Sequence, residues 1–391
     1  MSASGIPLSL AEQARRTGCL SIDTEFVGEG RYRTLLCLVQ VSVQNEDDPG
    51  GPARVEILDP LNGGLDPAPL AAVLADPGVE IIMHAGRQDV ALLRREWETE
   101  ITNLFDTQVA AGFAGMRAQL GYEALLNELL DVRVRKSASF TRWDARPLSP
   151  EQLAYARDDV LHLIDAALEL QGRLDASGRL GWAREECRAL QSVSDVRDVE
   201  TIFSKLPRVN AMSPEQRAVA LALVSWREAT AQTEDRPVQQ VLADAGLVEI
   251  AKRAPSSIDK LRQIRGLHEG TLRRRGAAIL EAVQRGRKDP PIEAEGERPL
   301  PGNPADAALI VLAESLVRTR ASEAGLAYEL IAARADLQRI VTAARNDLPE
   351  PDVRTLQGWR REVVGAELLE LLGGHRALRV GSGLNVVVDA S

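Results

Sequence analysis

Cysteine is scarce in this sequence, with three residues among 391: Cys19, Cys37 and Cys187. Cys19 and Cys37 lie on strand-like apolar segments, and none of the three has the spacing of metal ligands. This pattern argues against a disulfide framework and against a cysteine metal site. We expect reduced core cysteines in a cytoplasmic protein.

Long hydrophobic runs are absent too. No apolar run approaches the ~18 residues needed to cross a bilayer, and residues 1–18 lack the apolar core of a secretory signal. We therefore expect no membrane partner. A phosphate-binding loop of the Gly-x-x-x-x-Gly-Lys-Ser/Thr type is also missing, so we expect no attached helicase motor.

Positive charge is in deficit, with a formal net charge of −10, but the deficit is uneven. Residues 1–190 carry 19 Lys and Arg against 29 Asp and Glu, and residues 289–391 carry 11 against 16. Residues 212–288 reverse this balance, with 14 against 9. A basic block suits a polyanionic partner, whereas acidic surroundings suit a cation-dependent site.

The first half of the chain alternates strand-like and helix-like segments. Short turns between the first three strands predict antiparallel pairing, and a helix start at Ser149, Pro150 and Gln152 is well formed. We predict an α/β domain with a mixed sheet. The expected strands are 19–26, 35–43, 54–59, 80–85 and 103–107, and the expected helices are 86–97, 121–131 and about 149–172.

Strand signals end after residue 213, where Ser213, Pro214 and Glu215 open a helical region that runs to Gly286. Residues 289–304 are rich in proline and charge and are typical of a linker. A second helical block covers about 305–373. The residues from Arg376 onward show no assignable pattern.

The strand at 19–26 carries Asp23 and Glu25 on one face, because strand side chains alternate. A solvated edge strand explains such a pair, and so does a cation site. Two carboxylates ~5 Å apart repel by about 3 kcal/mol at an effective dielectric near 20. Several such pairs in one cleft would need bound cations, so convergence of further acids decides the question.

Further acids follow at two places. Asp89 opens the helix after the strand 80–85, where α/β sheets place functional groups, although a helix N-terminal acid can serve the helix dipole alone. Tyr155 and Asp159 share one face of the helix that begins at Pro150. Asp158 is a rival to Asp159, and periodicity leaves the two open.

These acids lie in motifs that resemble those of the DEDD nucleases: DTE at 23–25, HAGRQD at 84–89 and YARDD at 155–159. The Tyr-x-x-x-Asp spacing is typical of the tyrosine-bearing subgroup. The connecting segments are similar to those of the ribonuclease D family over nearly all of residues 19–190. They are FDTQVAA (105–111), GYEALL (121–126) and RWDARPLSPEQLAYARDDVLHL (142–163).

The resemblance implies a ribonuclease-H-like sheet and 3′–5′ exonuclease activity. It also implies that Asp159, not Asp158, joins Asp23, Glu25, Asp89 and Tyr155 as a catalytic residue. The four carboxylates would hold two divalent cations, Mg²⁺ or Mn²⁺, because all-oxygen ligands favour these ions over zinc. Tyr155 would orient the attacking water.

Candidates for substrate contact are His84, Gln40 and Arg146, with Trp143 and Lys136 nearby. Each has a structural alternative: His84 as a polar strand end, Gln40 as an edge-strand residue, and Trp143 as packing under its loop. We favour the packing role for Trp143 and the substrate role for Arg146.

Residues 212–288 resemble the helical HRDC domain shared by the ribonuclease D family and RecQ-type helicases. The likeness rests on ALVSWREATAQTEDRPVQQVLAD (222–244) and SIDKLRQIRGLHEGTLRRRG (257–276). We expect a core with Trp226, Leu261, Ile264 and Leu272. The densest basic cluster consists of Arg262, Arg265, Arg273, Arg274 and Arg275, and we favour RNA contact for the last three over an inert solvated face.

We predict an exonuclease domain (1–205), an HRDC domain (206–288), a linker (289–304) and a second, diverged HRDC-like domain with a tail (305–391). The predicted function is removal of nucleotides from RNA 3′ ends as 5′-monophosphates, by a monomer. The family implies RNA with single-stranded 3′ ends, such as tRNA precursors. A DNA 3′–5′ exonuclease and a catalytically silent RNA-binding scaffold are the alternatives, and the complete set of acids argues against the scaffold.

Overall fold

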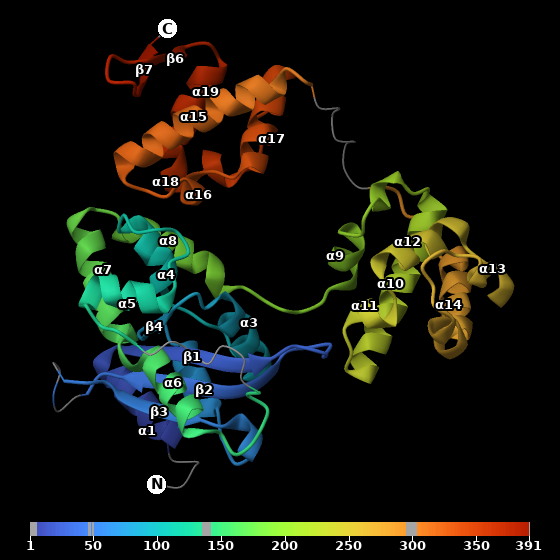
Figure 1. Cartoon of the computed structure of the whole chain (residues 1–391), viewed down its shortest axis with the longest axis horizontal. Helices are drawn as coiled ribbons and strands as arrows, with labels where there is room; N and C mark the ends of the chain where they lie inside the picture. Colours follow the sequence, from blue (N-terminus) through green and yellow to red (C-terminus); the bar gives the residue numbers. More distant parts are fainter. Residues whose placement is uncertain (1–5, 46–47, 49–50, 135–141, 295–302, 391) are drawn as a thin grey trace. The chain divides into compact units, whose positions relative to one another are not determined.

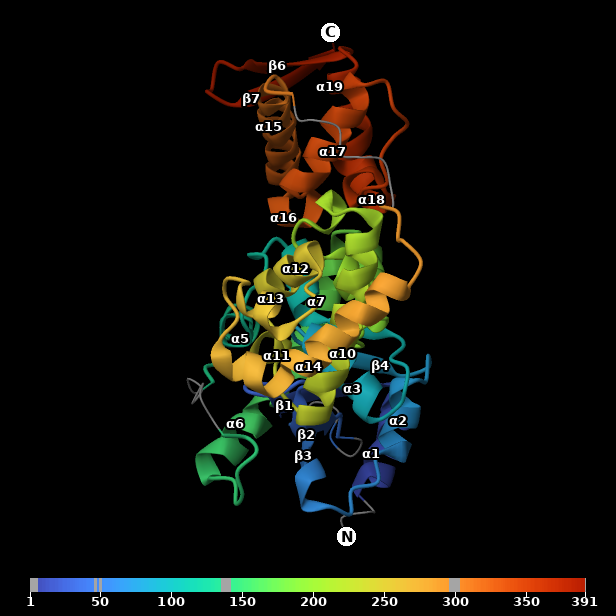
Figure 2. The ribbon, with the colours of Figure 1, turned by 90° about the vertical axis from the view of Figure 1, so that its right-hand side faces the viewer.

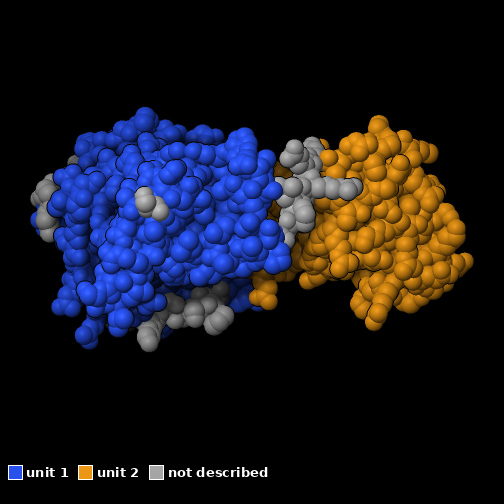
Figure 3. All heavy atoms as spheres, turned by 90° about the horizontal axis from the view of Figure 1, so that it is seen from above, with its two compact units in different colours: residues 1–25, 37–194, 299–391 blue, residues 26–36, 195–298 orange. Residues whose placement is uncertain are grey.

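The computed structural model describes residues 6–45, 48, 51–134, 142–294 and 303–390. These residues divide into two compact units, coloured blue and orange in Figure 3. Unit 1 contains residues 1–25, 37–194 and 299–391, and unit 2 contains residues 26–36 and 195–298. None of the described helices combines the length and the apolar character that a membrane span requires.

Unit 1 is built on a five-stranded mixed sheet, as predicted, in the order β3-β2-β1-β4-β5. β2 and β3 are antiparallel, whereas β1 pairs with β4, and β4 with β5, in parallel. Eight of the nine β2 residues are buried, which explains its apolar run. The strands are β1 (Cys19–Val27), β2 (Leu35–Val43), β3 (Arg54–Leu58), β4 (Glu80–Met83) and β5 (Leu104–Asp106).

Helices surround this sheet (Figure 1). The expected helix from residue 149 to about 172 is two helices in the structure, α6 and α7, which meet at His162. The predicted capping box is confirmed: Ser149 Oγ accepts from the Gln152 backbone at 3.2 Å. The helices are α1 (Ile6–Thr17), α2 (Ala68–Leu74), α3 (Arg87–Glu96), α4 (Thr107–Phe113), α5 (Tyr122–Leu130), α6 (Pro150–Leu161), α7 (Leu163–Ala176) and α8 (Leu180–Gln191), with a 3₁₀ turn η1 (Pro60–Asn62).

The C-terminal residues of unit 1 form a helical block followed by a hairpin that the sequence did not reveal. The hairpin strands β6 (Arg376–Val380) and β7 (Val386–Ala390) are antiparallel and lie against α19 and α15 (Figures 1 and 2). The other elements are α15 (Asp306–Ala324), α16 (Tyr328–Ile331), α17 (Arg334–Arg345), η3 (Arg354–Leu356), α18 (Gly358–Arg360), the π-helical turn η4 (Arg361–Gly365) and α19 (Ala366–Leu372).

This C-terminal block shares one apolar core with the helices of the sheet domain. Trp359 stacks on Trp182 with ring centroids 5.4 Å apart, and its edge meets Phe113 at 5.0 Å. The Arg360 guanidinium makes two bonds of 2.6 Å to the carboxylate of Glu186 on α8. The block predicted as a separate domain is therefore part of the same compact unit.

Unit 2 is helical, and its longest helix, α10, starts with a capping box at Ser213 and Gln216. The loop after β1 belongs to this unit: Tyr32 Oη donates to Glu228 at 3.1 Å, and Arg31 pairs with Asp235 at 2.9 Å. The elements are α9 (Val199–Ser204), η2 (Val209–Ala211), α10 (Pro214–Glu234), α11 (Val238–Val241), α12 (Asp244–Arg253), α13 (Ile258–Arg262) and α14 (Glu269–Lys288).

The Arg360–Glu186 pair yields the first prediction. Arg360 is only 6% exposed, so Arg360→Ala removes the charged partner of the partly buried Glu186 carboxylate, which keeps a hydrogen bond from the Trp359 indole N–H. We expect the free energy of unfolding to fall by roughly 2–3 kcal/mol, which is less than the cost of breaking a fully buried pair. Denaturant unfolding of the full chain measures it.

Arg379→Ala is the matched control, because Arg379 pairs with Asp389 on the exposed hairpin. A surface pair contributes about 0–1 kcal/mol. Equal losses in the two variants would contradict the idea that the C-terminal block is held by the buried pair.

Candidate active site

Three carboxylates from distant parts of the chain meet at one place. Asp23 and Glu25 lie on β1, and Asp159 lies near the end of α6. Each offers an oxygen, and these oxygens all lie within 4.8 Å of one another. The convergence predicted from the sequence is therefore present, with Asp159 rather than Asp158 in the cluster.

Asp89 lies beside this cluster in the first turn of α3 and is 7% exposed. Its Oδ1 accepts a short hydrogen bond from the hydroxyl of Thr24, the residue between the two acids of β1. Its negative charge raises the pKa of both Asp23 and Glu25. Thr24 was not predicted, although its place in DTE was a signal.

Two buried serines hold α6 against the sheet. Ser42 of β2 donates to the Val160 carbonyl at 2.9 Å, and Ser21 of β1 lies 3.4 Å from the same oxygen. The two hydroxyls are 2.5 Å apart. Both hydroxyls contact the Val160 carbonyl oxygen at the end of α6, one residue beyond Asp159. This contact holds Asp159 next to Asp23. α6 ends at Leu161, the residue after this contact.

Asp106 positions the turn that carries Asp89. Its carboxylate accepts from the backbone N–H groups of Ala85 and Gly86 at 3.2 and 2.8 Å, between β4 and α3. The same carboxylate caps α4 through Gln108 and Val109. One buried side chain therefore fixes both the turn before Asp89 and the next helix.

The electrostatics of the cluster are unfavourable for four negative charges. Burial, followed by repulsion from Asp159 and Asp89, raises the pKa of Glu25 to about 8. Burial also raises the pKa of Asp159 to about 7 and that of Asp89 to about 6, and it raises the pKa of Asp23 well above the usual range. In the folded chain, the simultaneous ionisation of these four acids is therefore unfavourable.

This donor set fits hard divalent cations. Every ligand atom is a carboxylate oxygen, as Mg²⁺ and Mn²⁺ prefer, and no cysteine or histidine belongs to the cluster in the described residues. A cation would remove the repulsion that burial intensifies. The arrangement can therefore hold a cation but is poorly suited to remain empty at neutral pH.

Tyr155 lies one helical turn before Asp159, and a hydrogen bond between the two opposes the rise in the pKa of Asp159. The Tyr155 ring lies 6.1 Å from that of Trp143, which is buried as favoured. Tyr122 was not predicted, although GYEALL contains it. Its ring lies 5.5 Å from His84, and its hydroxyl donates to the Asp158 carbonyl.

His84 has one nitrogen without a partner. Its Nδ1 bonds Thr107 Oγ1 at 2.9 Å, and Thr107 Oγ1 also contacts the Met83 carbonyl. The tautomer decides which of Nδ1 and Thr107 Oγ1 donates, and Nε2 is buried without a hydrogen-bond partner in the described structure. Burial also lowers the pKa of His84, so the ring is neutral at pH 7.

Gln40 and Arg146 differ in what they can still bind. Gln40 is fully buried on β2, and both amide atoms lack a partner among the described residues. Arg146, in contrast, makes two bonds to Asp59 and bonds the carbonyl of Cys37 at 2.9 Å. Its guanidinium thus ties a loop to the sheet, and a substrate role for it stays a prediction. Lys136 lies outside the described residues.

The three predicted RNA-binding arginines of α14 differ in their exposure to solvent. Arg273 and Arg274 are exposed, whereas Arg275 is 6% exposed and bonds Glu234. Consecutive helix positions are 100° apart, so three neighbours cannot share a face, and Arg275 lies next to the buried Gly276. The predicted core residues Leu261, Ile264 and Leu272 are buried, while Trp226 is only partly so.

Comparison with known proteins agrees with this geometry. Residues 4–175 match the family model described as 3′-5′ exonuclease, and residues 216–283 match that of the HRDC domain. A curated protein named Ribonuclease D from Gluconacetobacter diazotrophicus is 38% identical over 380 residues, covering 95% of this chain and 92% of that protein. Its namesake from Granulibacter bethesdensis is 36% identical over 385 residues, with the same coverage.

Solved structures give the same result. The crystal structure of Escherichia coli RNase D, described as an exoribonuclease involved in structured RNA processing, is similar to this chain with a TM-score of 0.79 and 28% identity. The alignment covers 95% of this chain and 97% of that one. The similarity extends through both the sheet domain and the helical regions.

The raised pKa of Glu25 predicts a gain in stability on its neutralisation. Glutamate ordinarily titrates near 4.5 and Glu25 near 8, so between these values the folded state binds more protons and stability falls as pH rises. Glu25→Gln should raise the melting temperature in EDTA at pH 8, by ~2–4 °C for each ~1 kcal/mol. The gain should shrink at pH 5, as thermal unfolding will measure.

Glu29→Gln is the control, because it removes an exposed charge four residues further along the chain. A Glu25→Gln protein that melts below the wild type at pH 8 would show that the carboxylate stabilises the metal-free fold.

Proposed function

Because the chain belongs to the ribonuclease D family and is a 3′–5′ exoribonuclease, we propose that it acts at the carboxylate cluster. We also propose that it shortens unpaired RNA 3′ ends, with tRNA precursors among its substrates. The observation that carries the proposal is the meeting of Asp23, Glu25 and Asp159 within 4.8 Å, next to the buried Asp89.

We infer that Asp23, Glu25, Asp89 and Asp159 hold two divalent cations, either Mg²⁺ or Mn²⁺. When bound, these ions supply positive charge that lowers the pKa of a water molecule and neutralises the departing 3′ oxygen. The chain itself supplies four preassembled anionic ligands. Thr24 keeps Asp89 oriented, and the serines at the end of α6 do the same for Asp159.

Tyr155 would orient the attacking water. Burial and the neighbouring Asp159 raise the pKa of Tyr155 above its usual value of 10, so the hydroxyl keeps its proton at neutral pH. A protonated phenol does not act as a base, and because this proton is bonded to Asp159, the phenol oxygen is left to accept a hydrogen bond from the water. Trp143 packs near the ring.

His84 and Gln40 are the proposed substrate contacts within the exonuclease domain. His84 Nε2 has no hydrogen-bond partner among the described residues, and it suits a ribose hydroxyl, which can both donate and accept. Gln40 carries an unpaired amide on β2, on the same strand face as Ser42, which contacts α6. Both groups are polar, buried and unsatisfied, which is costly unless a ligand or water pairs with them.

Burial of the carboxylates also supports the choice of an unpaired end. A paired stem is too wide to bring its phosphate to half-buried side chains, whereas a single strand can reach them. Structured RNAs with short unpaired 3′ tails, such as tRNA precursors, have this form. In unit 2, the exposed Arg273 and Arg274 would add phosphate contacts.

The activity is tested with 3′-extended RNA and the matching single-stranded DNA, in Mg²⁺, Mn²⁺ or EDTA. With either metal, RNA should be degraded with release of 5′-monophosphates, and DNA should be degraded more slowly. Neither polymer should be degraded in EDTA. Asp159→Asn should lower the rate at least ~100-fold, because a lost ligand costs more than a lost supporting contact.

The control is Asp158→Asn, which neutralises the neighbouring acid outside the cluster and should leave the rate near wild type. Equal losses in the two variants would contradict the assignment of Asp159, and faster degradation of DNA would contradict an RNA substrate.

Replacing Arg273 and Arg274 together with Ala should weaken RNA binding and reduce its salt dependence. Each phosphate contact in a single strand contributes about 0.7 to the slope of log affinity against log salt, so two lost contacts reduce it by about 1.4. Arg275→Ala should instead lower the melting temperature, because it removes a buried guanidinium that bonds Glu234 and the Gln240 carbonyl. An unchanged slope in the double variant would remove these arginines from the RNA surface.

A further inference from the structure

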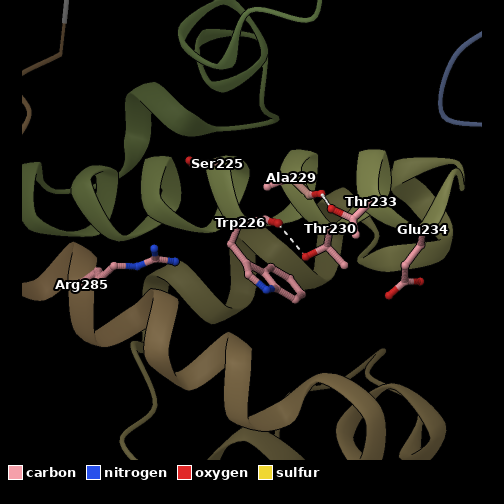
Figure 4. Close-up of a pocket in the computed structure, with 7 residues that line it drawn as sticks. All are labelled: Ser225, Trp226, Ala229, Thr230, Thr233, Glu234 and Arg285. Atoms are coloured by element: carbon pink, nitrogen blue, oxygen red, sulfur yellow. Dashed lines mark hydrogen bonds between the residues drawn. The ribbon is translucent and has the colours of Figure 1, made fainter.

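A groove of about 360 Å³ lies on unit 2 between α10 and α14 (Figure 4). It is separate from the basic residues Arg273 and Arg274, which do not line it. Six of its lining residues come from α10 and one from α14: Ser225, Trp226, Ala229, Thr230, Thr233, Glu234 and Arg285. Its size is at the lower end for small-ligand pockets, which is suitable for a single nucleotide.

Trp226 packs against the core of unit 2, but packing accounts for only part of this side chain. The sequence predicted it as a core residue, yet it is only partly buried, and the indole points from α10 into the groove (Figure 4). A partly exposed indole that lines a groove with polar groups beside it offers a surface on which a nucleic acid base can stack.

The available charge at the groove is positive. Arg285 is exposed, and its side chain has no ion pair or hydrogen bond within the described residues. Glu234, the one acid of the groove, is already bonded to Arg275 and lies 3.9 Å from Arg236. A phosphate is therefore attracted by Arg285 and meets a largely compensated carboxylate.

The threonine hydroxyls of the groove have a defined polarity. Thr230 donates to the Trp226 carbonyl and Thr233 donates to the Ala229 carbonyl, each at 2.8 Å (Figure 4). Their protons are thus committed to the helix, and the oxygens remain as acceptors. An acceptor beside a stacked base favours bases that carry an amino group.

We propose that this groove of unit 2 binds one unpaired nucleotide of the RNA substrate. The base stacks on Trp226, its amino group donates to the threonine oxygens, and the phosphate pairs with Arg285. The proposal deepens the proposed function, on which it rests for the identity of the polymer. It assigns to unit 2 a base-binding site in addition to phosphate contacts.

Binding of labelled C12 and U12 RNA to the full chain in EDTA at pH 8 tests this, by fluorescence anisotropy. The two pyrimidines stack similarly but differ in the exocyclic amino group, so C12 should bind several-fold more tightly than U12. Trp226→Ala should weaken C12 binding about tenfold, the lower end for one lost stacking partner. Trp226→Phe should restore most of it, which a purely structural loss of the indole would not explain.

Arg285→Gln should weaken the binding of both oligomers and reduce the slope of log affinity against log salt by about 0.7. Arg253→Gln, which removes an exposed charge of unit 2 outside the groove, should leave binding unchanged. Thr230→Val should abolish the preference for C12.

Wild-type affinity in a folded Trp226→Ala protein would overturn the proposal, and so would equal binding of C12 and U12. These readouts contain no metal and no cleavage. Failure of the catalytic assignment would appear only in the degradation assay, so the two failures are distinguishable.

Discussion

Repulsion between carboxylates is the constraint on which the active site depends. Asp23 and Glu25 share a strand face, and the fold adds Asp159 within 4.8 Å and Asp89 beside them. Burial makes this arrangement worse, since it strengthens the repulsion and removes water that would solvate the charges. A chain gains nothing for its own stability from such a cluster. The cost is understandable if cations complete the site, because the same repulsion then becomes affinity for positive charge.

The rest of the fold supplies the contacts that keep these acids together. Thr24 holds Asp89, and Asp106 fixes the turn that leads to it. Ser21 and Ser42 tie the end of α6 to β1 and β2, which places Asp159. Thr24, Ser21 and Ser42 are neutral, so they add no negative charge to the cluster. Asp106 is the exception, and four backbone N–H groups compensate its charge.

The sequence was most informative where a residue type has few uses. Strand periodicity predicted the mixed sheet and a capping box predicted the start of α6, whereas the meeting of Asp159 with Asp23 and Glu25 was implied by the resemblance to the DEDD nucleases. Periodicity could not separate Asp158 from Asp159, because both flank the same helix face. Arginine has many uses, and the sequence could not show that Arg275 is buried against Glu234 or that Arg146 is bonded to Asp59. The packing of Trp359 on Trp182 joins residues 177 positions apart, and no local pattern encodes such a contact.

The central claim is that the four acids share two cations. A crystal grown with Mn²⁺ and a nucleoside 5′-monophosphate tests it directly, because anomalous scattering locates manganese independently of the protein model. The account predicts two peaks about 3.5–4 Å apart, bounded by the carboxylate oxygens of Asp23, Glu25, Asp89 and Asp159. A fully occupied Mn²⁺ site elsewhere, with no peak in contact with Asp23 and Asp159, would contradict it.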